Sequence, residues 1–154
     1  MKFDNKLTDV MTVAGLNLIA QALTIYDADL RLVLCNAPFQ QMFDLPKALV
    51  TAGASFEETI THLARSGEYG DVADVRAFVA ERVVQARAFE PHYMERTRAN
   101  GRTISVEGSP LPQGGWVTVY TDISRTKQQE ALLRARSDAL SGQVLAHAEE
   151  LSAT

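Results

Sequence analysis

Residues 23–36 read Leu-Thr-Ile-Tyr-Asp-Ala-Asp-Leu-Arg-Leu-Val-Leu-Cys-Asn, and they contain the first strand signals of the sequence. Residues 23–26 and 30–35 are rich in β-branched, aromatic and aliphatic side chains, which favour strands. Asp27-Ala28-Asp29 between them predicts a turn, because short carboxylate side chains accept hydrogen bonds from nearby backbone amides. The stretch therefore predicts a β-hairpin, and Asn36 after it is suited to cap a short helix.

A second group of strand signals follows in the C-terminal half. Residues 92–97 and 102–107 alternate between polar and apolar side chains, and Asn100-Gly101 between them is a strong hairpin turn. Prolines and glycines at positions 110–115 mark another turn before residues 116–121 alternate again. These strands and the first hairpin predict an α+β fold with one five-stranded antiparallel sheet and flanking helices.

Apolar residues at helical spacing predict the helices between the two groups of strands. Ser55 and Glu58 form a capping box at the start of one helix, and Pro91 bars a later one from continuing. In the last strand Trp116, Thr118 and Tyr120 point to one face, while the residues between them point to the other. Both faces carry apolar groups, so each is expected to be covered.

The two ends of the chain predict further helices. Residues 5–20 carry a single apolar stripe, which we expect to cover the outer face of the sheet or a partner chain; it consists of Leu7, Val10, Met11, Ala14 and Leu18. Residues 123–151 predict a parallel dimeric coiled coil. Its expected dimer seam consists of Leu133, Leu140, Val144, His147 and Leu151. The expected organisation is thus an amphipathic helix over residues 1–20, a domain over 21–123 and a signalling helix over 124–154.

Composition excludes several classes of protein. The 154 residues include 15 Lys or Arg and 19 Asp or Glu, a net charge of −4, with no basic block suited to nucleic acid. The apolar runs are shorter than the roughly 18 residues that cross a bilayer, so no direct membrane insertion is expected. A single cysteine and the lack of a signal peptide favour the cytoplasm, although a piece of a larger membrane-bound protein would look the same.

The order and spacing of several short motifs resemble a PAS domain, the sensory module of signalling proteins, over about residues 21–127. The resemblance is closest to PAS domains of bacterial sensor histidine kinases and diguanylate cyclases in two-component and related signal transduction. Ser124 stands where threonine is usual, and Asp44 where glycine is frequent. The motifs are Tyr26–Val33 with Asn36, then Phe39, Phe43, Leu45 and Pro46, then Asn100-Gly101-Arg102, Pro110-Leu111-Pro112, Gly114-Gly115 and Asp122-Ile123-Ser124-Arg125-Thr126-Lys127.

This resemblance implies a homodimer that passes a conformational signal through its C-terminal helix to an output domain. The expected signal junction is Asp122, Ile123 and Ser124, with Asp122 either paired with Arg98, Asn100 or Arg102 or acting as a helix cap. A small ligand is expected between the sheet and the middle helices. The candidate pocket residues are Ile25, Phe43, Phe56, Leu63, Phe78, Val79, Tyr93 and Thr118.

Cofactor and enzyme chemistry find little support in the sequence. His62 lies about 160° around its helix from Ile60, so it is expected to face solvent rather than ligate haem. Cys35 ends a strand and lacks the sequence motif of flavin photoreceptors, and no metal site is expected. No candidate nucleophile lies beside a candidate base, so no catalytic residue is expected. The alternatives are a ligand-free dimerisation module, a haem or flavin sensor, and a small α+β enzyme.

Overall fold

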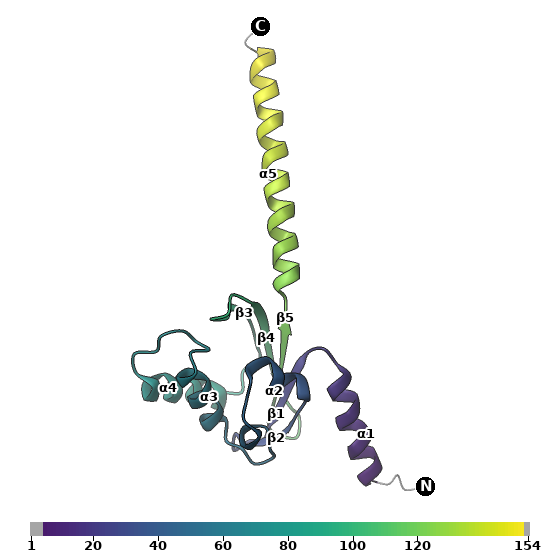
Figure 1. Ribbon diagram of the computed structural model, residues 1–154, viewed down its shortest axis with the longest axis vertical. Coiled ribbons are helices and arrows are strands. Elements are labelled where there is room, and N and C mark those ends of the chain that lie inside the picture. The colour runs from purple at the N-terminus through teal and green to yellow at the C-terminus, as the bar shows by residue number, and fades with distance from the viewer. Residues whose placement is uncertain (1–4, 153–154) are drawn as a thin grey trace. The chain divides into compact units, whose positions relative to one another are not determined.

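The computed structural model describes the backbone of residues 5–152 and the side chains of residues 7–146 and 148 (Figure 1). Five strands form one antiparallel sheet, as predicted, and the strand order is β2-β1-β5-β4-β3. The chain divides into two units, residues 1–122 and 123–154. The strands are β1 (Ala22–Tyr26), β2 (Leu32–Cys35), β3 (His92–Thr97), β4 (Thr103–Pro110) and β5 (Trp116–Asp122).

Side chains at the predicted positions cap the helices. Asn36 Oδ1 accepts from Phe39 N at 3.2 Å, and Ser55 Oγ accepts from Glu58 N at 3.0 Å. Both caps satisfy amides that have no partner within their helix. The helices are α1 (Asn5–Leu18), α2 (Ala37–Phe43), the short 3-10 helix η1 (Lys47–Leu49), α3 (Phe56–Arg65), α4 (Val75–Arg87) and α5 (Ser124–Ser152).

The first hairpin has a longer turn than the predicted Asp27–Asp29. Asp27 Oδ1 accepts from the amides of both Asp29 and Arg31, at 2.9 and 3.0 Å. Leu30 adopts a left-handed conformation with φ 58°. Because these bonds hold Leu30 in the turn, β2 begins at Leu32 instead of residue 30.

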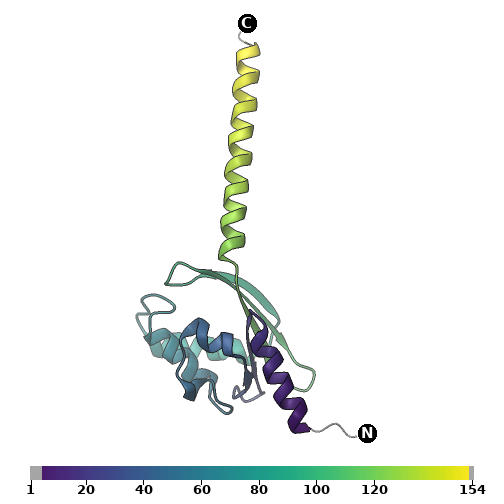
Figure 2. The same cartoon turned by 45° about the vertical axis from the view of Figure 1, so that its right-hand side comes forward.

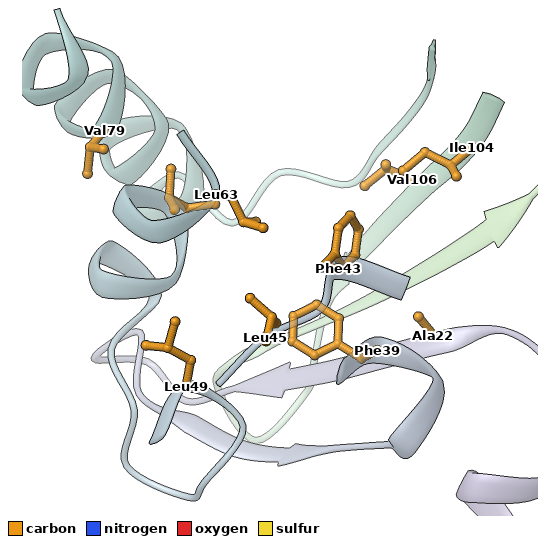
Figure 3. Packing of buried hydrophobic residues seen from close by; sticks show 10 residues of the cluster. Ala22, Phe39, Phe43, Leu45, Leu49, Leu63, Val79, Ile104 and Val106 are labelled. Carbon is orange, nitrogen blue, oxygen red and sulfur yellow. The ribbon is translucent and has the colours of Figure 1, made fainter. Parts of the chain in front are cut away.

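One face of the sheet packs against α2, α3 and α4, and this is where the core lies (Figure 3). Phe39 and Phe43 from α2 meet edge to face with ring centroids 5.5 Å apart. Burying each such side chain stabilises the fold by about 1.5–3 kcal/mol. Figure 3 shows these rings between the sheet residues and the helical residues of the core, which include Ala22, Ile104, Val106, Leu63 and Val79.

The chain enters and leaves the sheet at neighbouring points. β1 and β5 are adjacent at the centre of the sheet, and Ala22 at the start of β1 pairs with Tyr120 near the end of β5. Gln21 Nε2 donates to Thr121 Oγ1 at 3.0 Å, which ties the residue before β1 to the end of β5.

Helix α1, drawn in purple in Figure 2, leaves the apolar side chains of its stripe exposed in the single chain; the exposure follows from their accessible surface. Its large stripe residues are 58–88% exposed, so the stripe does not lie on the outer face of the sheet. The C-terminal end of the helix is held instead, because Asn36 Nδ2 donates to Leu16 O at 2.9 Å and Ala37 N donates to Asn17 Oδ1 at 2.7 Å. The other expectation, a partner chain on the stripe, stays a prediction.

Helix α5 also presents apolar side chains to solvent. Of the predicted seam, Leu133, Leu140 and Val144 are 56–68% exposed, while the side chains of His147 and Leu151 lie outside the described residues. Leu132 and Leu145 are similarly exposed but lie off that seam. Among residues 5–152, no helix combines the length and apolar character that crossing a membrane requires.

Candidate functional site

A cavity of about 610 Å³ lies between the inner face of the sheet, helices α3 and α4, and the segment that joins α4 to β3. This volume is within the range of small-molecule sites. Most of its surface is apolar, and it opens to solvent where exposed residues such as Val84 and Met94 border it. Six aromatic side chains contribute to the wall: Tyr26, Phe56, Tyr69, His92, Trp116 and Tyr120.

The indole of Trp116 forms a fixed part of this wall. Its Nε1 donates to Thr118 Oγ1 at 2.9 Å, and its ring stacks on His92 with centroids 5.3 Å apart and planes at 20°. Trp116 on β5 reaches His92 on β3 across Gly108 of β4, which has no side chain in the way. The ring of Phe56 meets Tyr26 edge to face at 5.6 Å on another part of the wall.

The tyrosine hydroxyls of the cavity stay protonated at neutral pH. Burial raises the pKa of Tyr26 to about 12, against a smaller lowering by the Thr59 side chain. Burial also raises the pKa of Tyr69 and that of Tyr120. A phenol that stays neutral can donate or accept a hydrogen bond, but it cannot act as a base near pH 7.

The cavity also has a basic region, centred on Tyr69. The guanidinium carbons of Arg82 and Arg96 lie 5.5 and 4.9 Å from the centre of the Tyr69 ring. Arg82 lies 5.0 Å from the ring of Phe78 as well. Both arginines line the cavity, and such cation–π contacts hold their side chains against the aromatic wall.

Glu68, next to Tyr69, accepts from two arginines. Arg96 Nη1 donates at 2.9 Å, and Arg98 donates from Nη2 at 2.7 Å and from Nε at 3.1 Å. Burial by itself would raise the pKa of Glu68, but the hydrogen bonds from Arg98 and Arg96 outweigh it and lower the pKa. Arg98 also donates to Met42 O at 2.7 Å, so this ion pair joins the α3–α4 loop, β3 and the end of α2.

Of the eight predicted pocket residues, the structure places Phe56 and Thr118 on the cavity wall. Phe43, Leu63 and Val79 pack in the core, and Phe78 packs against it. Ile25 and Tyr93 lie on the outer face of the sheet, because they alternate with the inward residues Tyr26 and Met94; Tyr93 is 62% exposed. The prediction that Trp116, Thr118 and Tyr120 share a face is confirmed, since all three line the cavity.

Sequence reasoning missed the polar wall of the cavity. Tyr69 lies in a loop, Arg82 flanks the apolar stripe of α4, and Arg96 and His92 occupy alternate positions of β3. The period-two pattern of residues 92–97 could have indicated which side chains of β3 face inward. No local signal pairs Glu68 with arginines about 30 residues away.

The predicted signal junction contains a defined ion pair. Arg102 donates from Nε to Asp122 Oδ2 at 2.9 Å, and its Nη2 lies 2.9 Å from the same oxygen. Arg102 follows the β3–β4 turn, where Arg98 N donates to Arg102 O at 2.7 Å. Of the three partners considered for Asp122, the structure thus selects Arg102. Ile123 and Ser124 follow, with Ser124 buried.

The groups considered for cofactor chemistry lie in different places. His62 borders a separate groove with Arg31 and Arg65, outside the cavity, whereas His92 lines the cavity. Cys35 is half-buried, its Sγ lies 3.5 Å from Val50 O, and burial raises the pKa of its thiol. No cluster of three or more His, Cys, Asp or Glu suited to a metal ion occurs in the part of the chain that the structure describes.

Comparisons with known proteins bear on the fold. A family model described as the PAS fold matches residues 16–131. The PAS domain of BvgS from Bordetella pertussis superposes with a TM-score of 0.52 at 20% identity, covering 87% of this chain and 99% of that one. A phage VqmA, solved as a VqmA–DPO complex, gives a TM-score of 0.51 at 18% identity and covers 88% of this chain.

The present chain spans 61% of that phage protein. A domain of a sensory box sensor histidine kinase/response regulator from Geobacter sulfurreducens gives a TM-score of 0.46 at 17% identity, covering 77% of this chain and 97% of that domain. No curated protein matches the chain. At these identities the two superpositions with TM-scores above 0.5, those of BvgS and the phage VqmA, show the fold alone.

Proposed function

This chain belongs to the PAS fold family, and on this premise we propose that it is a cytoplasmic sensory domain that binds a small ligand, dimerises and signals to an output module. The observation that carries the proposal is the cavity of about 610 Å³ on the inner face of the sheet. PAS domains are sensory modules in general. The role of this one in a two-component system with a histidine kinase is part of the proposal.

The contacts around the cavity supply a route for the signal. Tyr69 lines the cavity, and the adjacent Glu68 binds Arg96 and Arg98. Arg98 is joined through the β3–β4 turn to Arg102, which binds Asp122 directly before α5. A ligand that displaces Tyr69 therefore acts on a short series of charged contacts that ends at the junction.

Exposed apolar residues on α1 and α5 support the homodimer. Leaving a leucine or valine side chain in water forgoes about 1.5–3 kcal/mol that burial would contribute. The 29 residues of α5 form a helix about 43 Å long. Helices in proteins draw most of their stability from packing, so a partner chain along Leu133, Leu140 and Val144 would stabilise α5. Alternate steps of three and four residues also place the polar residues Glu130 and Ser137 in this seam. They make it weak enough to allow two arrangements that differ little in free energy.

The chemistry of the cavity argues against catalysis. The tyrosines on its wall are held in the neutral form, and Arg96 is engaged by Glu68. The lining residues provide recognition by aromatic surfaces and charge, without a nucleophile activated by a neighbouring base. We therefore propose a binding module and not an enzyme.

The proposal is tested on gently purified protein by native mass spectrometry and an absorption spectrum. Added mass that is released on denaturation would support a bound ligand, and a dimer mass would support the assembly. Absorption beyond 350 nm would identify a haem or flavin sensor instead. A dimer that carries no added mass and binds no small cyclohexylbutyl acid, alcohol or amine would favour the ligand-free dimerisation module.

A further inference from the structure

Arg82 is a cavity-lining cation that is not neutralised. No ion pair or hydrogen bond joins its guanidinium to a carboxylate among the described residues, whereas Arg96 beside it is bound by Glu68. Stacking on Tyr69 and Phe78 fixes the Arg82 side chain and leaves its five N–H donors available. A cation in a partly enclosed apolar site favours an anionic partner.

The surroundings of Arg82 strengthen this preference. Three guanidinium groups, those of Arg82, Arg96 and Arg98, gather around Tyr69 and Phe43, while Glu68 supplies one carboxylate. The balance of this cluster is therefore positive by two charges. Glu90, a carboxylate on the cavity wall, lies beyond the end of α4 next to Pro91 and His92.

The rest of the wall suits an apolar body. Phe56, Ile60, Val106 and the face of Trp116 contribute hydrocarbon and aromatic surface, and the neutral phenols of Tyr26 and Tyr120 add two hydrogen-bonding groups. An aromatic wall of this kind also attracts organic cations. Here Arg82 and Arg96 already lie against the ring of Tyr69, and they would repel a further cation.

We infer that the cavity takes an organic carboxylate with an apolar, ring-bearing body, whose carboxylate is bound by Arg82 and whose body lies against Trp116 and Phe56. This inference rests on the proposed function, since it names the ligand class of the same cavity. The planar guanidinium can bind both carboxylate oxygens at once.

The sequence contains one tryptophan, so the fluorescence of Trp116 reports directly on the cavity wall. Three probes of the same shape and different charge are titrated: 4-cyclohexylbutanoate, 4-cyclohexylbutan-1-ol and 4-cyclohexylbutan-1-amine. None absorbs where tryptophan emits. We expect the acid to bind about tenfold to a hundredfold more tightly than the alcohol, and the amine to bind most weakly.

Variants on α4 assign the preference to one side chain. Arg82→Gln is expected to abolish the difference between acid and alcohol while leaving alcohol binding within about threefold of the original. Arg82→Lys keeps the charge and should retain part of the preference. Arg76→Gln on the same helix removes an exposed arginine that does not line the cavity, and it should change nothing. Circular dichroism and thermal unfolding establish that each variant is folded.

The outcomes separate this inference from the proposed function. Alcohol or amine binding as tightly as the acid, or an acid preference that survives in Arg82→Gln, overturns the inference but leaves the ligand cavity in place. Where no probe binds, the compound released from natively purified protein decides: an acid supports the inference, and a neutral or cationic compound overturns it. No probe binding together with no added mass overturns both.

Discussion

The indole of Trp116 lies directly over Gly108, so that a Cβ atom on Gly108 would come within 2.3 Å of Trp116 Cζ2. The same Cβ would lie 2.9 Å from His92 Cε1. Strand β4 must therefore carry a glycine at this position for the Trp116–His92 stack to form across it. The absence of a side chain at Gly108 therefore allows the indole of Trp116 to take its position in the cavity wall.

Gly108→Ala is expected to displace the indole of Trp116 and to reduce the volume of the cavity. Overpacking of this kind costs about 1–3 kcal/mol of stability. Thermal unfolding measures that loss, and titration with 4-cyclohexylbutanoate measures the accompanying loss of affinity. Gly15→Ala is the control, because a Cβ there meets nothing within 4 Å and alanine favours the helix. Unchanged stability and affinity in Gly108→Ala would contradict the assigned wall.

Glu68→Gln is expected to lower the free energy of unfolding by about 3 kcal/mol, because it leaves two arginines without their carboxylate. Glu68 is only 9% exposed, so solvent screens the pair little. The folded-state pKa of Glu68 lies below its ordinary value of 4.5, so its contribution is complete above pH 4.5 and is lost as pH falls through the folded pKa. Chemical unfolding measures the free energy of unfolding between pH 3 and 7. This free energy should depend less on pH in Glu68→Gln than in the control Glu81→Gln, which changes an exposed residue.

Asp122→Asn is expected to preserve the fold and to weaken coupling to α5. The Arg102 and Asp122 side chains are 53% and 35% exposed, so breaking their pair should cost less than about 1 kcal/mol. Hydrogen exchange of residues 123–130, measured with and without 4-cyclohexylbutanoate, should change on binding in the original protein and much less in the variant. Global unfolding of Asp122→Asn would show instead that the residue is structural.

Alanine at Leu133, Leu140 and Val144 together is expected to dissociate the dimer. Sedimentation at tens of micromolar measures this, and a chain that ends at Ser124 should behave similarly. The matched control places alanine at Leu132 and Leu145, which are equally exposed but lie off the seam. A monomer in the original protein, or equal effects of both sets, would rule out this seam.

Met11→Glu tests whether the stripe of α1 contacts a partner chain. Met11 is exposed in the single chain, so glutamate there should leave the stability of the monomer unchanged. In a dimer that buries the stripe, the buried carboxylate would weaken association or shift the oligomeric state. Thr12→Glu, on another side of the helix, is the control. Deleting residues 1–20 should also lower the melting temperature or shift the oligomeric state. No change in either the melting temperature or the number of chains per particle would contradict a role for the stripe.

The elements of this fold were predictable because their signals are local. Asn36, Ser55 and Asn100-Gly101 act within a few residues, and each performs the predicted cap or turn. Local signals did not predict which residues of β1 face inward. Ile25 and Tyr26 are adjacent and point to opposite faces of the sheet, and both have largely apolar side chains, so either could face the core. Pairing with β5 decides it: Tyr26 stands opposite Trp116 and so shares its face, which leaves Ile25 outside.

The basic region was beyond sequence reasoning for a different reason. In the sequence Arg82 is a polar residue next to the apolar Val83 and Val84, and only the fold brings Tyr69 and Arg96 to it. Charged groups contribute to a site according to how their charges are compensated, and the compensation of Arg96 by Glu68 is a long-range contact. The difference between a neutralised and an available arginine therefore emerges only in three dimensions.

The hydrogen bond between Gln21 and Thr121 has a consequence for evolution as well as for structure. The chain enters the sheet at β1 and leaves it at the adjacent strand β5. The intervening residues, about one hundred in number, therefore form a domain whose two ends lie next to each other. Domains whose ends lie close together can be inserted into other proteins with little disturbance. The sheet and its cavity can thus be gained, lost or exchanged as one cassette between the segment that precedes β1 and the segment that follows β5.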